Sequence, residues 1–118
     1  MGEQATAGHI VAFGGLAMAE PGDEPAFRDL QELTGKDRPR VCYVPTASSE
    51  ASDHVIRFYA LAARLDWRPA HLSLFALPTA DLRGYLLGHD LIYVGGGNTK
   101  SMLALWREWR LDAILREA

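Results

Sequence analysis

The chain has 118 residues, a formal net charge of −3 and a hydrophobic content of 48%. This length suits one domain with a sizeable core, and the composition is that of a folded globular protein. The slight acidity and the absence of Lys/Arg runs argue against nucleic acid as a partner. No apolar stretch approaches the roughly 18 residues of a membrane span, so we expect no membrane insertion.

Cysteine content and the first residues of the chain indicate its cellular compartment. A single cysteine, Cys42, excludes an internal disulfide framework and a zinc site built from cysteines. The first residues are small and polar, with neither the basic start nor the apolar stretch of a secretory signal peptide. We therefore expect a cytoplasmic protein in a reducing compartment. Residues 1–8 are predicted to be a flexible N-terminus and residues 9–118 to form one α/β domain.

Apolar runs that end at glycine or proline predict four strands, at His9–Phe13, Arg40–Val44, Pro69–Phe75 and Asp90–Val94. Apolar residues recur at helical spacing in the segments 24–34, 52–65, 79–88, 100–109 and 111–118. Alternating strands and helices predict a parallel sheet flanked by helices on both faces. In such sheets, ligands bind beyond the carboxyl ends of the strands.

Helix starts and buried helix faces are also predicted from the sequence. Ser52 or Asp53 is expected to cap the second helix. Thr79 is expected to cap the third, with Asp81 in its first turn. Glycines are expected to end the first and third helices. In the segment 100–109, spacing places three apolar residues on one side, predicted to be core or interface: Leu103, Trp106 and Trp109.

The segment Gly95–Thr99 is the most specific local signal in the sequence. Three consecutive glycines permit positive φ angles and close approach of another group to the backbone. The loop leads into a helix whose first N–H groups are unpaired, so it is predicted to bind an anion or oxyanion. A tight turn without a ligand is the alternative. A P-loop would need glycine at Thr99, and a dinucleotide loop would need glycine or alanine at Lys100, so nucleotide binding is a second hypothesis.

Other side chains that could support chemistry are better explained by structure. Ser48 and Ser49 follow a strand, but no Gly-x-Ser-x-Gly elbow surrounds them, and we expect them to hydrogen-bond their own turn. Cys42 is predicted to pack in the core rather than to react. The four histidines share no metal-ligand spacing, so no metal or cofactor is predicted: His9, His54, His71 and His89.

The stretch Ile92–Thr99, followed by Met102–Leu103 and Trp106–Arg107, closely resembles the peptidase E family. These are serine dipeptidases that cleave after an N-terminal aspartate, and cyanophycinases are relatives. The similarity runs from about His9 to the last residue. The family's flavodoxin-like fold is similar to the class I glutamine amidotransferase domain, in agreement with the predicted sheet. Further stretches resemble the same family: Thr34–Lys36, Arg38–Val41, Val44–Ser48, Arg57–Tyr59 and His71–Phe75.

The resemblance implies hydrolysis of peptides with an N-terminal aspartate through an acyl-enzyme. It assigns oxyanion stabilisation to the N–H of Gly97, with Gly96, Asn98 and Thr99 beside it in the substrate cleft. In the first glycine loop, Gly14–Leu16, leucine stands where close relatives often have a third glycine.

The resemblance also implies that the catalytic triad lies outside these residues. In the family, a further strand with a Gly-x-Ser-Ala-Gly nucleophile elbow, the catalytic histidine and an acidic partner follow the segment that matches 111–118. We therefore expect an N-terminal part of such a peptidase, truncated before the nucleophile strand, without a catalytic residue of its own and inactive alone. Its partners would be a peptide substrate in the complete enzyme, and a second copy or a complementing C-terminal half. A non-catalytic binding or assembly module is the alternative, besides nucleotide binding.

Overall fold

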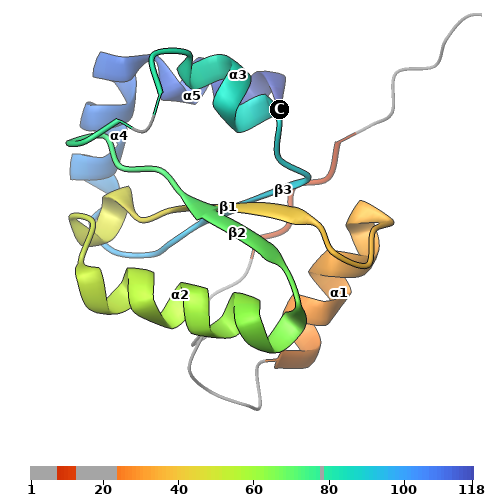
Figure 1. Ribbon diagram of the computed structural model, residues 1–118. Helices are drawn as coiled ribbons and strands as arrows, with labels where there is room; N and C mark the ends of the chain where they lie inside the picture. Colours follow the sequence, from red (N-terminus) through yellow and green to blue (C-terminus); the bar gives the residue numbers. More distant parts are fainter. Residues whose placement is uncertain (1–7, 13–23, 78) are drawn as a thin grey trace, which may run out of the picture.

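A computed structural model of the chain describes residues 8–12, 24–77 and 79–118 (Figure 1). Within these residues the elements follow one another in a regular alternation: α1 (Glu24–Thr34), β1 (Arg40–Val44), the short 3₁₀ turn η2 (Thr46–Ser48), α2 (Ser52–Leu65), β2 (Arg68–His71), α3 (Leu82–Leu87), β3 (Leu91–Val94), α4 (Thr99–Trp109) and α5 (Leu111–Glu117). The chain therefore has the βαβ organisation that the sequence predicts.

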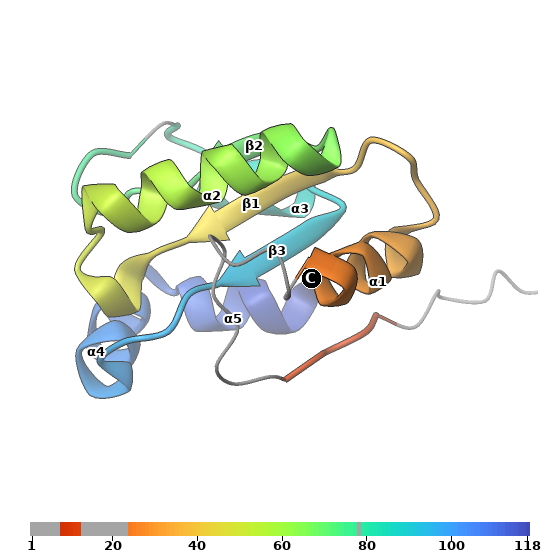
Figure 2. The ribbon, with the colours of Figure 1, turned by 90° about the horizontal axis from the view of Figure 1, so that it is seen from below.

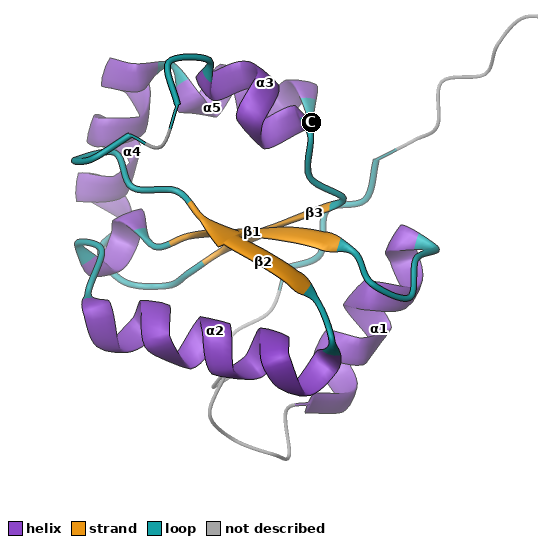
Figure 3. Ribbon diagram, in the orientation of Figure 1, coloured by secondary structure: helices purple, strands orange, loops and turns teal. Residues whose placement is uncertain are grey.

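The three strands form one parallel sheet in the order β2-β1-β3 (Figure 3). The central strand, β1, pairs on both sides, so that Tyr43 lies opposite His71 of β2 and Tyr93 of β3. The chain passes from β1 to β2 through α2, and then returns past β1 to β3 through α3. Such a reversal of direction creates a crevice beyond the carboxyl ends of the two diverging strands, here β1 and β3.

Alternate side chains of β1 pack in separate cores on the two faces of the sheet. Val41 and Tyr43 contact α1 and α2, where the ring of Tyr43 stacks on that of Phe58 at 4.9 Å. Cys42 and Val44 point the other way, toward α3, α4 and α5. Figure 1 shows these two helix layers on opposite sides of the sheet. A strand covered on both faces is apolar throughout, which explains the uninterrupted run in β1.

These observations confirm the predicted class: an α/β fold with a parallel sheet flanked by helices, as in flavodoxin-like proteins. The predicted strand at His9–Phe13 is wrong for the residues that the structure describes. Residues 8–12 have no strand conformation, and the side chain of Ile10 is 99% exposed. A strand needs a neighbour to pair with, and within the described residues the sheet consists of β2, β1 and β3 alone, with no pairing to residues 8–12. Phe13, residues 1–7 and the loop Gly14–Leu16 lie outside the described residues.

A second difference between prediction and structure concerns β2 (Arg68–His71), which ends at His71 rather than at the predicted Phe75. Leu72 and Leu74 are nevertheless fully or almost fully buried. The Leu72 N–H still donates to the Tyr43 carbonyl of β1 at 2.9 Å, so backbone pairing with β1 stops after Leu72 while core packing continues to Leu74. The Leu74 N–H donates to the carboxylate of Glu50 instead of to a neighbouring strand. An apolar run therefore indicates burial more reliably than backbone pairing.

Two predicted helix caps are also wrong. The N-cap of α3 is Asp81, whose Oδ1 accepts from the N–H of Gly84, whereas Thr79 accepts from the N–H of Asp81 one turn earlier. At the start of α2 the N-cap is Ala51 without a side-chain bond, so Ser52 and Asp53 lie in the first turn. Aspartate is still favourable there because of the helix dipole. The predicted glycine ends at Gly35 and Gly88 agree with the structure.

The helix α4 buries Trp106 and Met102, not the full predicted side. Trp109, the last residue of α4, is 40% exposed, although it lies three residues after the buried Trp106. Within the described ranges, no helix combines the length and apolarity that crossing a bilayer requires.

Candidate functional site

The loop after β3 runs from Gly95 to Asn98, and its first residue is fixed by the sheet. The N–H of Gly95 donates to the Val44 carbonyl at 3.1 Å, which extends the pairing of β3 with β1 by one residue. A Cβ at this position would lie 2.7 Å from the Tyr43 hydroxyl oxygen. The first glycine of the loop therefore gives room to a core tyrosine.

Gly97 is required for two independent reasons. Its φ is +146°, a conformation that residues with a side chain rarely adopt, and a Cβ there would be placed 2.1 Å from the Ala47 carbonyl oxygen. Gly96, in contrast, has open space where its Cβ would be. The three glycines therefore differ. Gly95 allows close approach of the Tyr43 side chain and Gly97 that of the Ala47 backbone, whereas Gly96 has no such neighbour.

The group that approaches is the turn η2, directly after β1. The N–H of Asn98 donates to the Ala47 carbonyl at 2.7 Å. On the buried side, the indole N–H of Trp106 donates to the Thr46 hydroxyl at 3.0 Å. The loops at the carboxyl ends of β1 and β3 are therefore joined through backbone and side chain, and both lie at the same edge of the sheet (Figure 2).

Asn98 also begins the helix that follows. Its side-chain Oδ1 accepts from the N–H of Ser101 at 3.0 Å, the usual N-cap bond. Both the main chain and the side-chain oxygen of Asn98 thus have structural partners. This N-cap is a residue function that the prediction missed, although an asparagine immediately before an amphipathic segment is a recognised signal.

The N–H groups of Gly96 and Gly97 differ from that of Asn98. Neither donates a hydrogen bond within the described part of the chain, and both residues are exposed, as is Thr99. N–H groups without partners in a loop that leads into a helix are the type of donor that can bind a negatively charged oxygen. All four predicted cleft residues are therefore contiguous and accessible: Gly96, Gly97, Asn98 and Thr99.

The serines next to this loop take part in turns. The Ser48 hydroxyl donates to the Pro45 carbonyl at 3.0 Å, within its own turn, as predicted. Ser49 is exposed and adopts φ +57°, with its N–H on the Thr46 carbonyl. Within the described ranges, no histidine is hydrogen-bonded to either serine, so the arrangement that activates a serine nucleophile is not formed there.

The remaining predicted candidates lie away from the loop and have structural partners. His71 Nδ1 lies 2.8 Å from the Tyr59 hydroxyl. His89 Nδ1 lies 2.8 Å from the Tyr85 carbonyl, and burial lowers the pKa of its imidazole. Burial raises the pKa of the Cys42 thiol to about 12, so its thiolate is scarce at neutral pH. The interpretation of these three residues as structural is supported by their contacts.

The fold and loop define an α/β protein with a carboxyl-edge site, and comparison with known proteins gives the family. The model of peptidase family S51 matches residues 10–118. The chain therefore belongs to peptidase family S51, as the resemblance to peptidase E predicted.

One curated relative shows how much of such a protein this chain represents. The chain is similar to a protein of Bacillus subtilis (strain 168) described as "Uncharacterized peptidase YgaJ", with 44% identity over 110 residues. The alignment covers 92% of this chain and 48% of the relative, so the chain spans about half the length of the curated relative it matches. No solved structure matches the chain.

Proposed function

We propose that this chain supplies the oxyanion-binding side of a serine-type dipeptidase that cleaves after an N-terminal aspartate. The nucleophile, the catalytic histidine and its acidic partner would come from residues outside these 118, which contain no Gly-x-Ser-x-Gly segment. Membership in peptidase family S51 supports a peptidase-related role. The substrate, the acyl-enzyme and a cytoplasmic location are parts of the proposal.

The main support is the pair of N–H groups at Gly96 and Gly97, which have no partner among residues 8–12, 24–77 and 79–118. The Gly97 N–H would donate to the oxygen that becomes negative when the nucleophile attacks the scissile carbonyl. Because the loop is already fixed on the Ala47 carbonyl by Asn98, little reorganisation would accompany the reaction. With Asn98 used in this way, Gly96 and Gly97 are the loop residues whose N–H groups have no partner among the described residues.

The proposal is tested by complementation. The chain is co-expressed with the C-terminal half of the Bacillus subtilis relative, and hydrolysis of Asp-Leu is measured. We expect activity from the pair and none from either half, since loss of a catalytic triad lowers the rate about a millionfold. Activity of the chain alone that survives Ser48→Ala and Ser49→Ala would show that a nucleophile lies elsewhere in it.

A second measurement tests the Gly97 N–H itself. Proline is unsuitable because its φ is incompatible with +146°, so the amide before Gly97 is replaced by an ester through protein semisynthesis. This change replaces the N–H group by an oxygen atom and alters no side chain. We expect kcat to fall about a hundredfold or more, with a smaller change in KM. An unchanged kcat in the folded complemented enzyme would contradict the oxyanion role.

A further inference from the structure

Glu50 occupies an unusual place at the carboxyl end of β1. It follows η2 and Ser49. The φ angle of Ser49 is +57° and that of Glu50 is +58°. L residues avoid this left-handed conformation, and glycine or asparagine would be the ordinary choice. The Glu50 N–H donates to the Pro45 carbonyl at 3.0 Å, which closes the turn. A strained segment therefore lies directly beside the glycine loop, where strain is most often associated with function.

The side chain of Glu50 stabilises this conformation. Its Oε1 accepts from the Ser73 hydroxyl at 2.6 Å, and its Oε2 accepts from the N–H of Leu74 at 2.6 Å. Short hydrogen bonds to a carboxylate are among the stronger ones in proteins. Since β2 has already ended at His71, these two bonds take the place of strand pairing between the loops after β1 and β2.

The turn that Glu50 holds is the same turn that holds the glycine loop. Ala47 accepts the N–H of Asn98, and Thr46 accepts the indole N–H of Trp106. A shift of η2 would therefore displace Gly97, whose α-carbon lies against the Ala47 carbonyl. The contacts form a continuous chain from Leu74 through Glu50 and η2 to the glycine loop.

We propose that Glu50 is a positioning residue: its carboxylate fixes η2, and through Ala47 it sets the place of the Gly96 and Gly97 N–H groups. The effect of Glu50 on catalysis rests on the proposed function. Its effect on the order of the glycine loop is independent of that function, and it is tested in the 118-residue chain itself.

The test compares Glu50→Ala with Glu50→Gln by NMR of the ¹⁵N-labelled chain. Glutamine can still accept from the Leu74 N–H and bond Ser73 with one polarity reversed, whereas alanine can do neither. We expect Glu50→Ala to accelerate amide exchange of Asn98 about tenfold or more and to shift the Trp106 indole resonance. Glu50→Gln should restore most of both. The Arg68 amide, which donates to the Pro39 carbonyl at the opposite end of the sheet, should change little and reports global stability.

Three outcomes would overturn the positioning role. One is unchanged Asn98 exchange and Trp106 resonance in Glu50→Ala, although the Leu74 amide is freed. Another is equal acceleration at Asn98 and Arg68, which would mean general destabilisation. If Glu50→Ala does not fold, Ser73→Ala removes one of the two bonds, and no change at Asn98 in that variant would also overturn the role. If the exchange results hold while the complemented enzyme is inactive, only the proposed function fails.

Discussion

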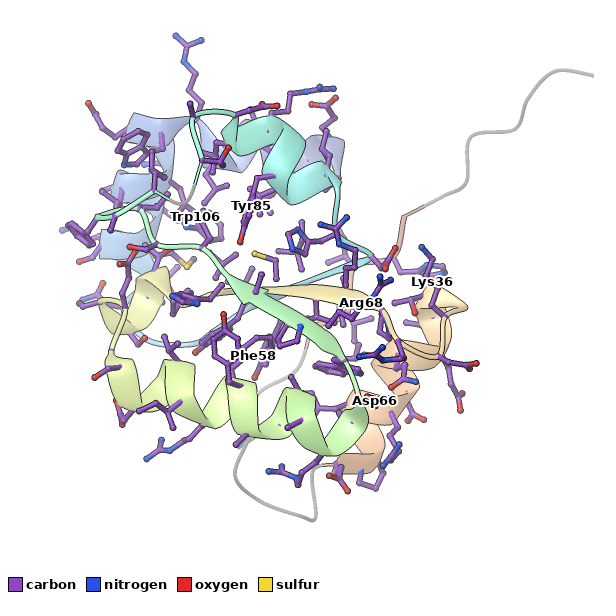
Figure 4. All side chains as sticks on the ribbon, viewed as in Figure 1. Lys36, Phe58, Asp66, Arg68, Tyr85 and Trp106 are labelled. Carbon is purple, nitrogen blue, oxygen red and sulfur yellow. The ribbon has the colours of Figure 1, made fainter. Side chains whose placement is uncertain are left out.

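The two ends of the sheet are built from different chemistry. At the amino ends of the strands, charged side chains are paired: Lys36 with Asp90 at 2.7 Å, and Arg38 with Asp66 at 3.3 Å. At the carboxyl ends, two consecutive residues other than glycine, Ser49 and Glu50, have positive φ, and the loops after β1 and β3 join through one backbone bond and one buried indole. Figure 4 shows Lys36, Asp66 and Arg68 at one end and Trp106 at the other. The amino end of the sheet therefore stabilises the fold through ion pairs, whereas the carboxyl end holds an accessible and strained loop.

The largest expected effect concerns the strained end. Gly97→Ala should lower the free energy of unfolding by about 3 kcal/mol, because the new Cβ meets the Ala47 carbonyl and φ is positive. Gly96→Ala, in open space, is the matched control and should change it by less than about 0.5 kcal/mol. Urea denaturation of both variants measures the difference. Equal stabilities would show that the close contact between the two loops is not formed.

A smaller effect is expected at the amino end. Asp90 accepts from the Lys36 ammonium and from the N–H of Arg40, so Asp90→Ala leaves this N–H without its partner. We expect a loss of about 1.5 kcal/mol. The control is Asp66→Asn, which breaks an ion pair whose side chains are 59% and 75% exposed and should change stability by less than about 0.5 kcal/mol. Asparagine also suits the left-handed conformation at this position. A larger loss of stability in Asp66→Asn than in Asp90→Ala would contradict the stabilising role given to Asp90.

The smallest effect is the pH dependence of the same end. The hydrogen bond from Lys36, followed by that from the Arg40 N–H, lowers the pKa of Asp90. A carboxyl group with a lowered pKa stabilises the fold above its unfolded-state pKa, and this contribution is lost as pH falls through the folded-state value. Since Lys36 is exposed, we expect at most about 1 kcal/mol between pH 6 and pH 2, measured as the difference between the chain and Asp90→Asn. Identical dependence of the unfolding free energy on pH in the two proteins would show that the Asp90 carboxylate does not stabilise the fold.

Much of the fold follows from local pattern, because helical spacing and short apolar runs are local. The bounds of α1 and β1 agree with the prediction for this reason. The early end of β2 could not be predicted, because it depends on a carboxylate 24 positions away from Leu74. The choice of Asp81 over Thr79 as a cap likewise depends on tertiary packing, since both side chains are adjacent and competent.

The site was predictable in its location but not in its construction. Three glycines after an apolar strand indicate a loop of special geometry, and the structure places that loop at the carboxyl edge. The contact of Gly97 with Ala47 is not encoded locally, and it makes Gly97→Ala a severe change rather than a mild one. Glu50 has no local signal, since nothing around it distinguishes it from an ordinary surface glutamate.

The strand order also determines when the site can form during synthesis. The central strand β1 leaves the ribosome before both of its partners, and the bond between Arg40 and Asp90 joins residues 50 positions apart. The β1–α2–β2 unit requires a shorter loop closure and can assemble first, with α2 covering one face of β1. The contact between η2 and the glycine loop forms only after β3 has been synthesised. The glycine loop therefore takes its place on η2 after the β1–α2–β2 unit has formed in a nascent chain.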